Sequence, residues 1–254
     1  MKTAVGALIF DMDGTMVDSM PFHRRSWGEF TRRHGIAMEL DEVLQRTTGR
    51  NGVECMQELF GRPMADEEAL KLVAEKEGIY RELFGPVFAE VRGFRAFARQ
   101  AAQRGLKLAV GTAGDRHNID FVMTRLHMAP APLAIVGGDE GLPGKPEPAI
   151  FLEAARRICV APAQCIVFED APLGIEAARR AGMRAVAICT THSAFELAGS
   201  HVIAQARNFD ELLMVVTVND VAPPLPSRLS VTRRLRVGCF CWLLDDRDTD
   251  FRTS

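Results

Sequence analysis

Two aspartates, Asp11 and Asp13, directly follow a short apolar run at residues 7–10. An apolar run of this length that ends in turn residues is typical of a buried strand, along which every second side chain points the same way. Two carboxylates held that close repel each other unless a cation lies between them. The stretch Asp11-Met12-Asp13-Gly14-Thr15 therefore indicates a site for a hard cation such as Mg²⁺.

Two other interpretations of this stretch have to be weighed. A calcium-binding loop needs a third acidic ligand and a glutamate at its twelfth position, where this chain has Phe22. An ordinary turn is compatible with the same Asp-x-Asp-Gly pattern. The stretch alone favours a phosphoryl-transfer site over the turn, and the rest of the chain must supply the context.

Strand and helix patterns alternate from residue 91 onward. The expected strands are 106–110, 133–136, 165–168, 184–188 and 201–204, and the expected helices are 92–104, 116–127, 147–158 and 172–181. Such alternation predicts an α/β fold with a Rossmann-like parallel sheet that helices cover on both faces. Ligands of such sheets bind beyond the carboxyl ends of the strands.

The polar residues that follow the predicted strands should therefore converge. They are Asp11, Asp13, Thr112, Lys145, Glu169 and Asp170. Each has a structural explanation of its own, since Thr112 could cap a helix, Lys145 could be a solvated loop residue and Glu169-Asp170 could be a strand exit. Four strand ends that offer carboxylates, a hydroxyl and a cation together are better explained by one site.

This set of residues could transfer a phosphoryl group. Asp11 would attack phosphorus, Asp13 would act as general acid and then base, and Lys145 would neutralise charge. Thr112 and the amide of Ala113 would hold a phosphate oxygen at a helix N-terminus. Mg²⁺ would be bound by Asp11, the main-chain carbonyl of Asp13 and Asp170, with Glu169 close by or bound through water.

Residues 19–87 have no strand pattern and predict helices at 39–47, 51–60 and 66–84, after a first helix that contains Phe22, Trp27 and Phe30. We expect them to form an inserted helical cap between two parts of one core, 1–18 and 88–217. Residues 218–254 begin with a proline-rich linker, and the sequence leaves the order and role of this tail open.

Up to about residue 217, the chain resembles the haloacid dehalogenase-like (HAD) hydrolase superfamily. The residues that resemble the four motifs of this superfamily are Asp11-Met12-Asp13-Gly14-Thr15, Thr112, Lys145-Pro146 and Glu169-Asp170. The helical insert resembles the C1 cap of the β-phosphoglucomutase-like subfamily. The resemblance implies a Rossmann-like core, Mg²⁺ and an aspartyl-phosphate. Asp11 favours phosphate chemistry over dehalogenation, and Asp13 disfavours a phosphonatase, as does the lack of a clear Schiff-base lysine.

Four cap residues resemble those that β-phosphoglucomutases use on sugar phosphates and in cap closure: His23, Trp27, Arg50 and Lys76. Arg50 could hold a distal phosphate bidentately, while His23 and Lys76 could pair with the hinge side of the site. Core packing is an equal alternative for Trp27, as is a place on the helix surface for His23. Sugar phosphatases share these positions, so they discriminate little between the two activities.

The run after the second core strand differs from that of the mutases. They tend to carry Ser-Ala-Ser-Lys-Asn, whereas this chain has Thr112-Ala113-Gly114-Asp115-Arg116, in which Arg116 is a candidate replacement for the lysine. The run is more similar to that of small sugar-phosphate phosphatases. We therefore predict a Mg²⁺-dependent phosphatase, with β-phosphoglucomutase as the alternative. A non-catalytic binding or regulatory protein ranks last because both aspartates are present.

The composition is that of an ordinary globular protein. The 254 residues are 47% hydrophobic and 25% charged, and the net charge of -2 gives no bias toward nucleic acid or an anionic membrane. The sequence has neither a membrane-length apolar run nor a signal-peptide pattern, which predicts a cytoplasmic protein. Its six cysteines are scattered, as is typical of reduced thiols. Cys239 and Cys241 lack partner ligands for zinc. We expect a small phosphate ester as the partner, and the oligomeric state stays open.

Overall fold

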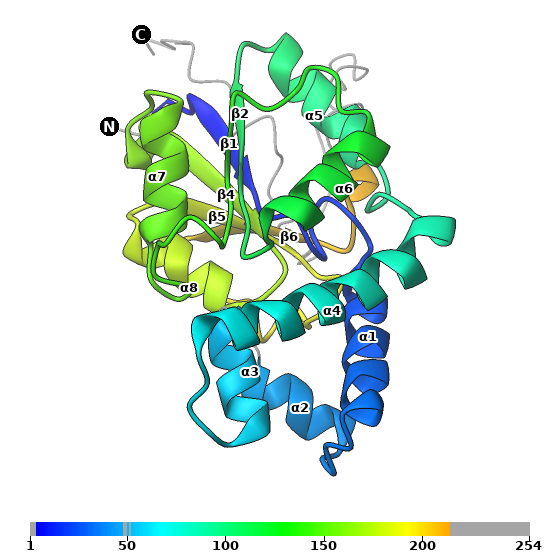
Figure 1. Cartoon of the computed structure of the whole chain (residues 1–254). Helices are drawn as coiled ribbons and strands as arrows, with labels where there is room; N and C mark the ends of the chain where they lie inside the picture. Colours follow the sequence, from blue (N-terminus) through cyan, green and yellow to red (C-terminus); the bar gives the residue numbers. More distant parts are fainter. Residues whose placement is uncertain (1–3, 48–49, 51, 214–254) are drawn as a thin grey trace, which may run out of the picture.

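A parallel sheet of six strands, in the order β3-β2-β1-β4-β5-β6, forms the centre of the protein (Figure 1). The computed structural model describes residues 4–47, 50 and 52–213. The strands are β1 (Ala7–Phe10), β2 (Lys107–Gly111), β3 (Ala134–Val136), β4 (Cys165–Glu169), β5 (Arg184–Ile188) and β6 (Val202–Ala206). The predicted Rossmann-like α/β fold is confirmed, and the strand order reverses between β1 and β4.

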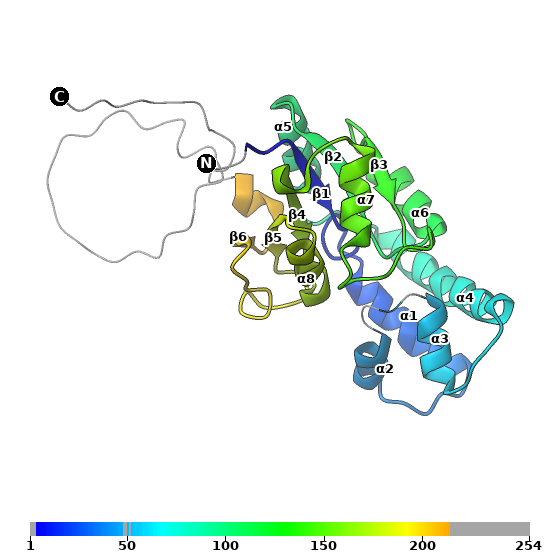
Figure 2. The same cartoon turned by 90° about the vertical axis from the view of Figure 1, so that its left-hand side faces the viewer.

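Helices cover both faces of the sheet (Figure 2). They are α5 (Phe94–Gln103), α6 (Arg116–Leu126), α7 (Ala149–Arg157) and α8 (Pro172–Arg180), with short 3₁₀ turns at Gly85–Val87 and Pro162–Gln164. On one face, Phe94 and Phe97 of α5 pack with Phe10 and Phe168 in an aromatic core. On the other face, α7 and α8 pack on Ile9 and Val167. The strands are apolar on both sides because both faces are buried.

The helices α1 (Met20–Arg33), α2 (Leu40–Thr47), α3 (Gly52–Phe60) and α4 (Asp66–Phe84) stand apart from the sheet. Figures 1 and 2 show them as a unit on the side where β1 leads into α1. This helical unit has a core of its own, in which Trp27, Phe30 and Val43 pack with Met56 and Ile79. The unit thus has the arrangement expected of an inserted cap, while the domain limits at residues 18 and 87 stay predictions.

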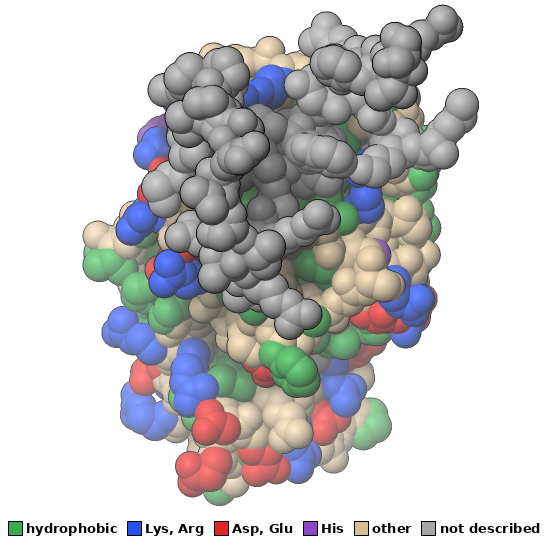
Figure 3. Space-filling model, turned by 180° about the vertical axis from the view of Figure 1, so that it is seen from behind, with side chains coloured by type: hydrophobic (Ala, Val, Ile, Leu, Met, Phe, Trp, Pro, Cys, Tyr) green, Lys and Arg blue, Asp and Glu red, His purple; other side chains and the backbone are tan. Residues whose placement is uncertain are grey.

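Several sequence-based predictions lie outside the described residues. These are the end of the core beyond residue 213, the tail at 218–254, and the Cys239–Cys241 pair. Within the described residues, no helix is long and apolar enough to span a membrane. Seen from behind, the described part of the surface has Lys and Arg interspersed with Asp and Glu (Figure 3). Ion pairs between such side chains occur in the described part of the chain, for example between Arg179 and Glu176.

Candidate active site

The site is formed where β1 and β4 lie side by side at the reversal of strand order. Asp11 follows β1, while Glu169 ends β4 and Asp170 follows it. All three side chains are buried, and one carboxylate oxygen of each lies within 4.8 Å of the others. The parallel register that pairs Phe10 with Phe168 explains this convergence, because it brings both strand ends to the same level.

Lys145 is the cation of this carboxylate cluster. Its Nζ donates to Asp11 Oδ1 at 2.5 Å and to Glu169 Oε1 at 2.6 Å. Burial would lower the pKa of Lys145, but the charges of Asp11 and Glu169 outweigh it and raise this pKa. The ammonium therefore stays charged between two carboxylates, as the prediction for Lys145 requires.

One lysine does not balance three buried carboxylates. Burial raises the pKa of Asp11 well above its usual range, against the lowering by Lys145, and Glu169 and Asp170 raise it further. Burial and the neighbouring Glu169 raise the pKa of Asp170 to about 7. A second positive charge would allow both aspartates to ionise, and three clustered carboxylate oxygens suit a hard divalent cation. The donor set therefore fits Mg²⁺.

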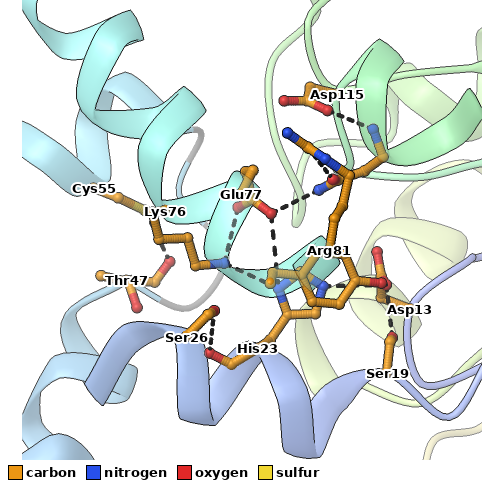
Figure 4. A network of polar contacts seen from close by, with 12 residues as sticks. Asp13, Ser19, His23, Ser26, Thr47, Cys55, Lys76, Glu77, Arg81 and Asp115 are labelled. Atoms are coloured by element: carbon orange, nitrogen blue, oxygen red, sulfur yellow. Dashed lines mark hydrogen bonds and ion pairs between the residues drawn. The ribbon is translucent and has the colours of Figure 1, made fainter. Parts of the chain in front are cut away.

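Asp13 lies beside this cluster and faces the helical unit (Figure 4). Its Oδ1 accepts hydrogen bonds from Ser19 Oγ at 2.6 Å, His23 Nε2 at 3.2 Å and Tyr80 Oη at 3.3 Å. Burial would raise the pKa of Asp13, but the interactions with His23 and Ser19 outweigh it and lower this pKa. Its carboxylate is not among the clustered oxygens, so the predicted metal contact of Asp13 rests on its main-chain carbonyl.

His23 joins Asp13 to the interior of the helical unit. Lys76 Nζ lies 3.0 Å from His23 Nδ1, and because an ammonium only donates, Nδ1 accepts and Nε2 carries the proton donated to Asp13. Tyr80 stacks on the His23 ring with centroids 3.8 Å apart. The structure thus places His23 in the Asp13 network and not on an open helix surface.

The other predicted cap residues lie deeper or farther out. Lys76 is only 2% exposed, with its Nζ 4.7 Å from the centre of the Trp27 ring, and Trp27 packs in the core of the helical unit. Arg50 donates to Arg46 O at 2.8 Å and pairs with Glu58 at 3.3 Å. The described contacts of Arg50 are therefore made within the helical unit, and its contact with a distal phosphate stays a prediction.

The loop after β2 faces Asp13. The hydroxyl of Thr112 is buried and accepts a hydrogen bond from the amide of Gly114 at 3.0 Å. A Cβ at Gly114 would lie 3.7 Å from Asp13 Oδ2, so this oxygen points to the loop, next to the exposed Ala113. Arg116 is instead exposed and pairs with Asp120 at 2.9 Å.

A polar bridge joins the helical unit to the core, and sequence patterns did not predict it. Asn118 of α6 donates to Glu77 Oε2 and accepts from Arg81 Nη1, both at 2.7 Å. Glu77 in turn accepts from Lys76 at 2.8 Å. Figure 4 shows Glu77 and Arg81 projecting from α4 toward α6, where Asp115 caps the helix. This continuous network connects Asp13 with the start of α6.

Further residues around the carboxylates also escaped prediction. Ser19 and Tyr80 hold Asp13, while Asp170 contacts Thr15 of the predicted motif and, in addition, Thr191 and His192. The last two residues follow β5, so the rule that pointed to the other strand ends could have found them. Tyr80 gave no such signal, because only the packing of α4 on α1 brings it to Asp13.

Gly174 provides a test of how tightly Glu169 is held. A Cβ at Gly174 would lie 1.8 Å from Glu169 Oε1, the oxygen that accepts from Lys145. We expect Gly174→Ala to displace the Glu169 carboxylate and lower the free energy of unfolding by about 2 to 3 kcal/mol in urea titrations.

Gly78→Ala is the matched control, because nothing lies within 4 Å of a Cβ there in α4. It should raise stability by up to about 1 kcal/mol. Equal stability of the two variants would contradict the clash.

Comparisons with known proteins agree with this geometry. The family model described as haloacid dehalogenase-like hydrolase matches residues 5–182. The chain is 34% identical over 195 residues to validoxylamine A 7'-phosphate phosphatase from Streptomyces hygroscopicus subsp. limoneus, covering 77% of this chain and 91% of that protein. It is 32% identical over 187 residues to fructose-1-phosphate phosphatase YqaB from Escherichia coli, covering 73% and 97%.

Solved structures have the same fold. A HAD hydrolase of family IA, variant 3, from Entamoeba histolytica aligns with a TM-score of 0.73 and 26% identity, over 82% of this chain and 95% of that one. A β-phosphoglucomutase from Clostridium difficile aligns with a TM-score of 0.64 and 25% identity, over 72% and 84%. The matched residues 5–182 include every motif of the carboxylate cluster, and this chain belongs to the haloacid dehalogenase-like hydrolases.

Proposed function

We propose that this protein is a Mg²⁺-dependent phosphatase that hydrolyses a small phosphate monoester of the sugar-phosphate class through an aspartyl-phosphate on Asp11. The observation that carries the proposal is the position of Asp11, whose carboxylate is buried, held by Lys145 at 2.5 Å and clustered with Glu169 and Asp170. A carboxylate fixed in this way is pre-positioned to attack phosphorus. Lys145 contacts Oδ1, so we assign the attack to Oδ2.

We assign Asp13 the role of general acid and base, and its lowered pKa favours the carboxylate form that accepts a proton in the second step. Its Oδ1 is fixed by Ser19 and His23, while Oδ2 faces the loop that begins at Thr112. We assign Oδ2 to donate a proton to the leaving oxygen and to accept one from the attacking water in the second step. Thr112 and the amide of Ala113 would bind oxygens of the phosphoryl group in the loop between β2 and α6, whose N-terminus is instead capped by Asp115.

Asp11, Asp170 and the main-chain carbonyl of Asp13 would hold the Mg²⁺, with Glu169 fixed by Lys145 and by the amide of Ala171 at 2.7 Å. When bound, the ion neutralises charge on the phosphoryl oxygens and on the carboxylates. The raised pKa values of Asp11 and Asp170 support this assignment, because a further positive charge beside them would favour the ionised form of both groups.

The substrate class is inferred from the relatives. Two proteins at 34% and 32% identity are named as phosphatases of validoxylamine A 7'-phosphate and fructose 1-phosphate. Both names describe a phosphatase of a small phosphate ester, and fructose 1-phosphate is a sugar phosphate.

β-Phosphoglucomutase is the second candidate, and the structural neighbour from Clostridium difficile favours it. A mutase must hold a second phosphate while it excludes water. The described contacts of Arg50 and Arg116 are to Glu58 and Asp120, so both guanidiniums would have to leave carboxylate partners to bind such a phosphate. This arrangement favours the phosphatase.

The two activities are separated by one assay. We expect the protein with Mg²⁺ to release inorganic phosphate from members of a panel of hexose and pentose phosphates, because water can take the phosphoryl group from Asp11. The same protein is incubated with β-glucose 1-phosphate, with and without glucose 1,6-bisphosphate. Glucose 6-phosphate formed without free phosphate would establish the mutase and overturn the proposal.

A further inference from the structure

The segment that follows β5 lies against the carboxylate cluster, and none of the roles assigned above uses it. Thr190 Oγ1 donates to the carbonyl of Gly14 at 2.5 Å, and Thr191 Oγ1 lies 2.5 Å from Asp170 Oδ2. His192 Nδ1 lies 2.9 Å from the carbonyl oxygen of Asp170. Three consecutive side chains thus contact both the Asp11–Thr15 motif and the end of β4.

The hydrogen positions in this segment follow from the partners. A carboxylate and a carbonyl only accept, so the single hydroxyl proton of Thr191 goes to Oδ2, which is nearer than the Asp170 carbonyl at 2.9 Å. His192 Nδ1 lies 2.9 Å from both that carbonyl and Thr191 Oγ1, and because the Thr191 proton goes to Oδ2, Nδ1 carries a proton that these two oxygens accept. Side chain and main chain of Asp170 are therefore held by separate donors from one segment.

The contact with Thr191 also decides which oxygen of Asp170 faces the cluster. A Cβ at Gly14 would lie 2.1 Å from Asp170 Oδ2, so this oxygen is enclosed by the Gly14 backbone on one side and the Thr191 hydroxyl on the other. Oδ1 has a longer contact, 3.3 Å, with Thr15 Oγ1. The enclosure of Oδ2 leaves Oδ1 as the oxygen for a cation between Asp170 and Asp11.

We propose that Thr191, assisted by His192, is a positioning residue that fixes the rotamer of Asp170 and thereby sets the affinity of the site for Mg²⁺. The inference rests on the proposed function, because it takes Asp170 as a ligand. Residues that hydrogen-bond a metal ligand orient it, and their removal typically weakens metal binding by about 10- to 100-fold. Thr191 itself is exposed, so its replacement leaves the core untouched.

The test measures Mg²⁺ binding to the full chain by calorimetry and by the Mg²⁺-dependent rise in Tm, without substrate. Thr191→Val keeps the shape but removes the donor, and Thr191→Ala removes it independently. Both should weaken Mg²⁺ binding by about 10-fold or more, whereas Thr191→Ser should keep most of the affinity. Ser193→Ala is the matched control from the same segment, because the Ser193 hydroxyl contacts Glu196.

Kinetics should agree with the binding data. In Thr191→Val, the Mg²⁺ concentration for half-maximal rate should rise, while the rate at saturating Mg²⁺ should stay near that of the natural chain. Unchanged Mg²⁺ affinity in Thr191→Val, or equal losses in Thr191→Val and Thr191→Ser, would overturn the inference. A natural chain that neither binds Mg²⁺ nor releases phosphate would overturn the proposed function instead, so the two failures are distinguishable.

Discussion

Asp11→Asn should abolish phosphate release while the protein stays folded. The substitution keeps the size of the side chain but removes the negative charge that attacks phosphorus, so we expect the rate to fall by at least about 1,000-fold. The measurement is inorganic phosphate released from the best substrate of the hexose and pentose phosphate panel, at saturating Mg²⁺. Such a loss corresponds to about 4 kcal/mol of transition-state stabilisation.

The melting temperature of Asp11→Asn shows whether a loss of activity arises from the chemistry or from unfolding. Burial and the neighbouring carboxylates raise the pKa of Asp11, so its ionised form is costly in the folded protein without metal. An unfolded aspartate ionises near pH 4, and above that pH the charge of Asp11 therefore reduces stability. Asp11→Asn should equal or exceed the natural chain in Tm at neutral pH without Mg²⁺. Full activity in Asp11→Asn would exclude Asp11 as the nucleophile.

Lys145→Met should have the second large effect, on both activity and stability. Lys145 donates to Asp11 at 2.5 Å and Glu169 at 2.6 Å, and its side chain is only 8% exposed. Removing one partner of a buried ion pair typically costs about 3 to 5 kcal/mol, because the remaining charge stays uncompensated. We expect a comparable fall in the free energy of unfolding in metal-free urea titrations at neutral pH, together with a loss of phosphate release.

The stability of Lys145→Met with and without Mg²⁺ should distinguish the effect of lost charge from that of lost packing. If the deficit arises from the unbalanced carboxylates of Asp11, Glu169 and Asp170, saturating Mg²⁺ should restore part of the stability of Lys145→Met but little of its activity. Lys107→Met is the matched control, because Lys107 Nζ donates to the carbonyl of Ile158 outside the site. Its activity should be unaffected. An active Lys145→Met would contradict the assignment of Lys145.

Much of the fold could be predicted because local signals mark its elements. Apolar runs followed by turn residues place the strands, and glycines stand just after helix ends, such as Gly61 after α3 and Gly105 after α5. The Asp11 cluster was also predictable, because the carboxyl ends of parallel strands meet at one edge of the sheet. The sheet reverses between β1 and β4, where Asp11 and Asp170 follow the strands.

The remaining site residues depend on packing that the sequence does not encode locally. Tyr80 reaches Asp13 only because α4 packs on α1, and Asn118 bridges to Glu77 only because α6 lies beside α4. Thr191 is a different case, since it follows a predicted strand and could have been found by the same rule. The described partners of Arg50 are Arg46 and Glu58, and its predicted contact with a distal phosphate stays a prediction.

Rapid acid quenching followed by peptide mass spectrometry shows whether Asp11 carries the phosphoryl group during turnover. The natural chain is mixed with Mg²⁺ and its best sugar-phosphate substrate and quenched during the first turnover. We expect a phosphoryl group on the peptide that contains Asp11, and none in Asp11→Asn. Phosphorylation of a different residue, or rapid turnover with no phosphorylated peptide at any quench time, would contradict this role of Asp11.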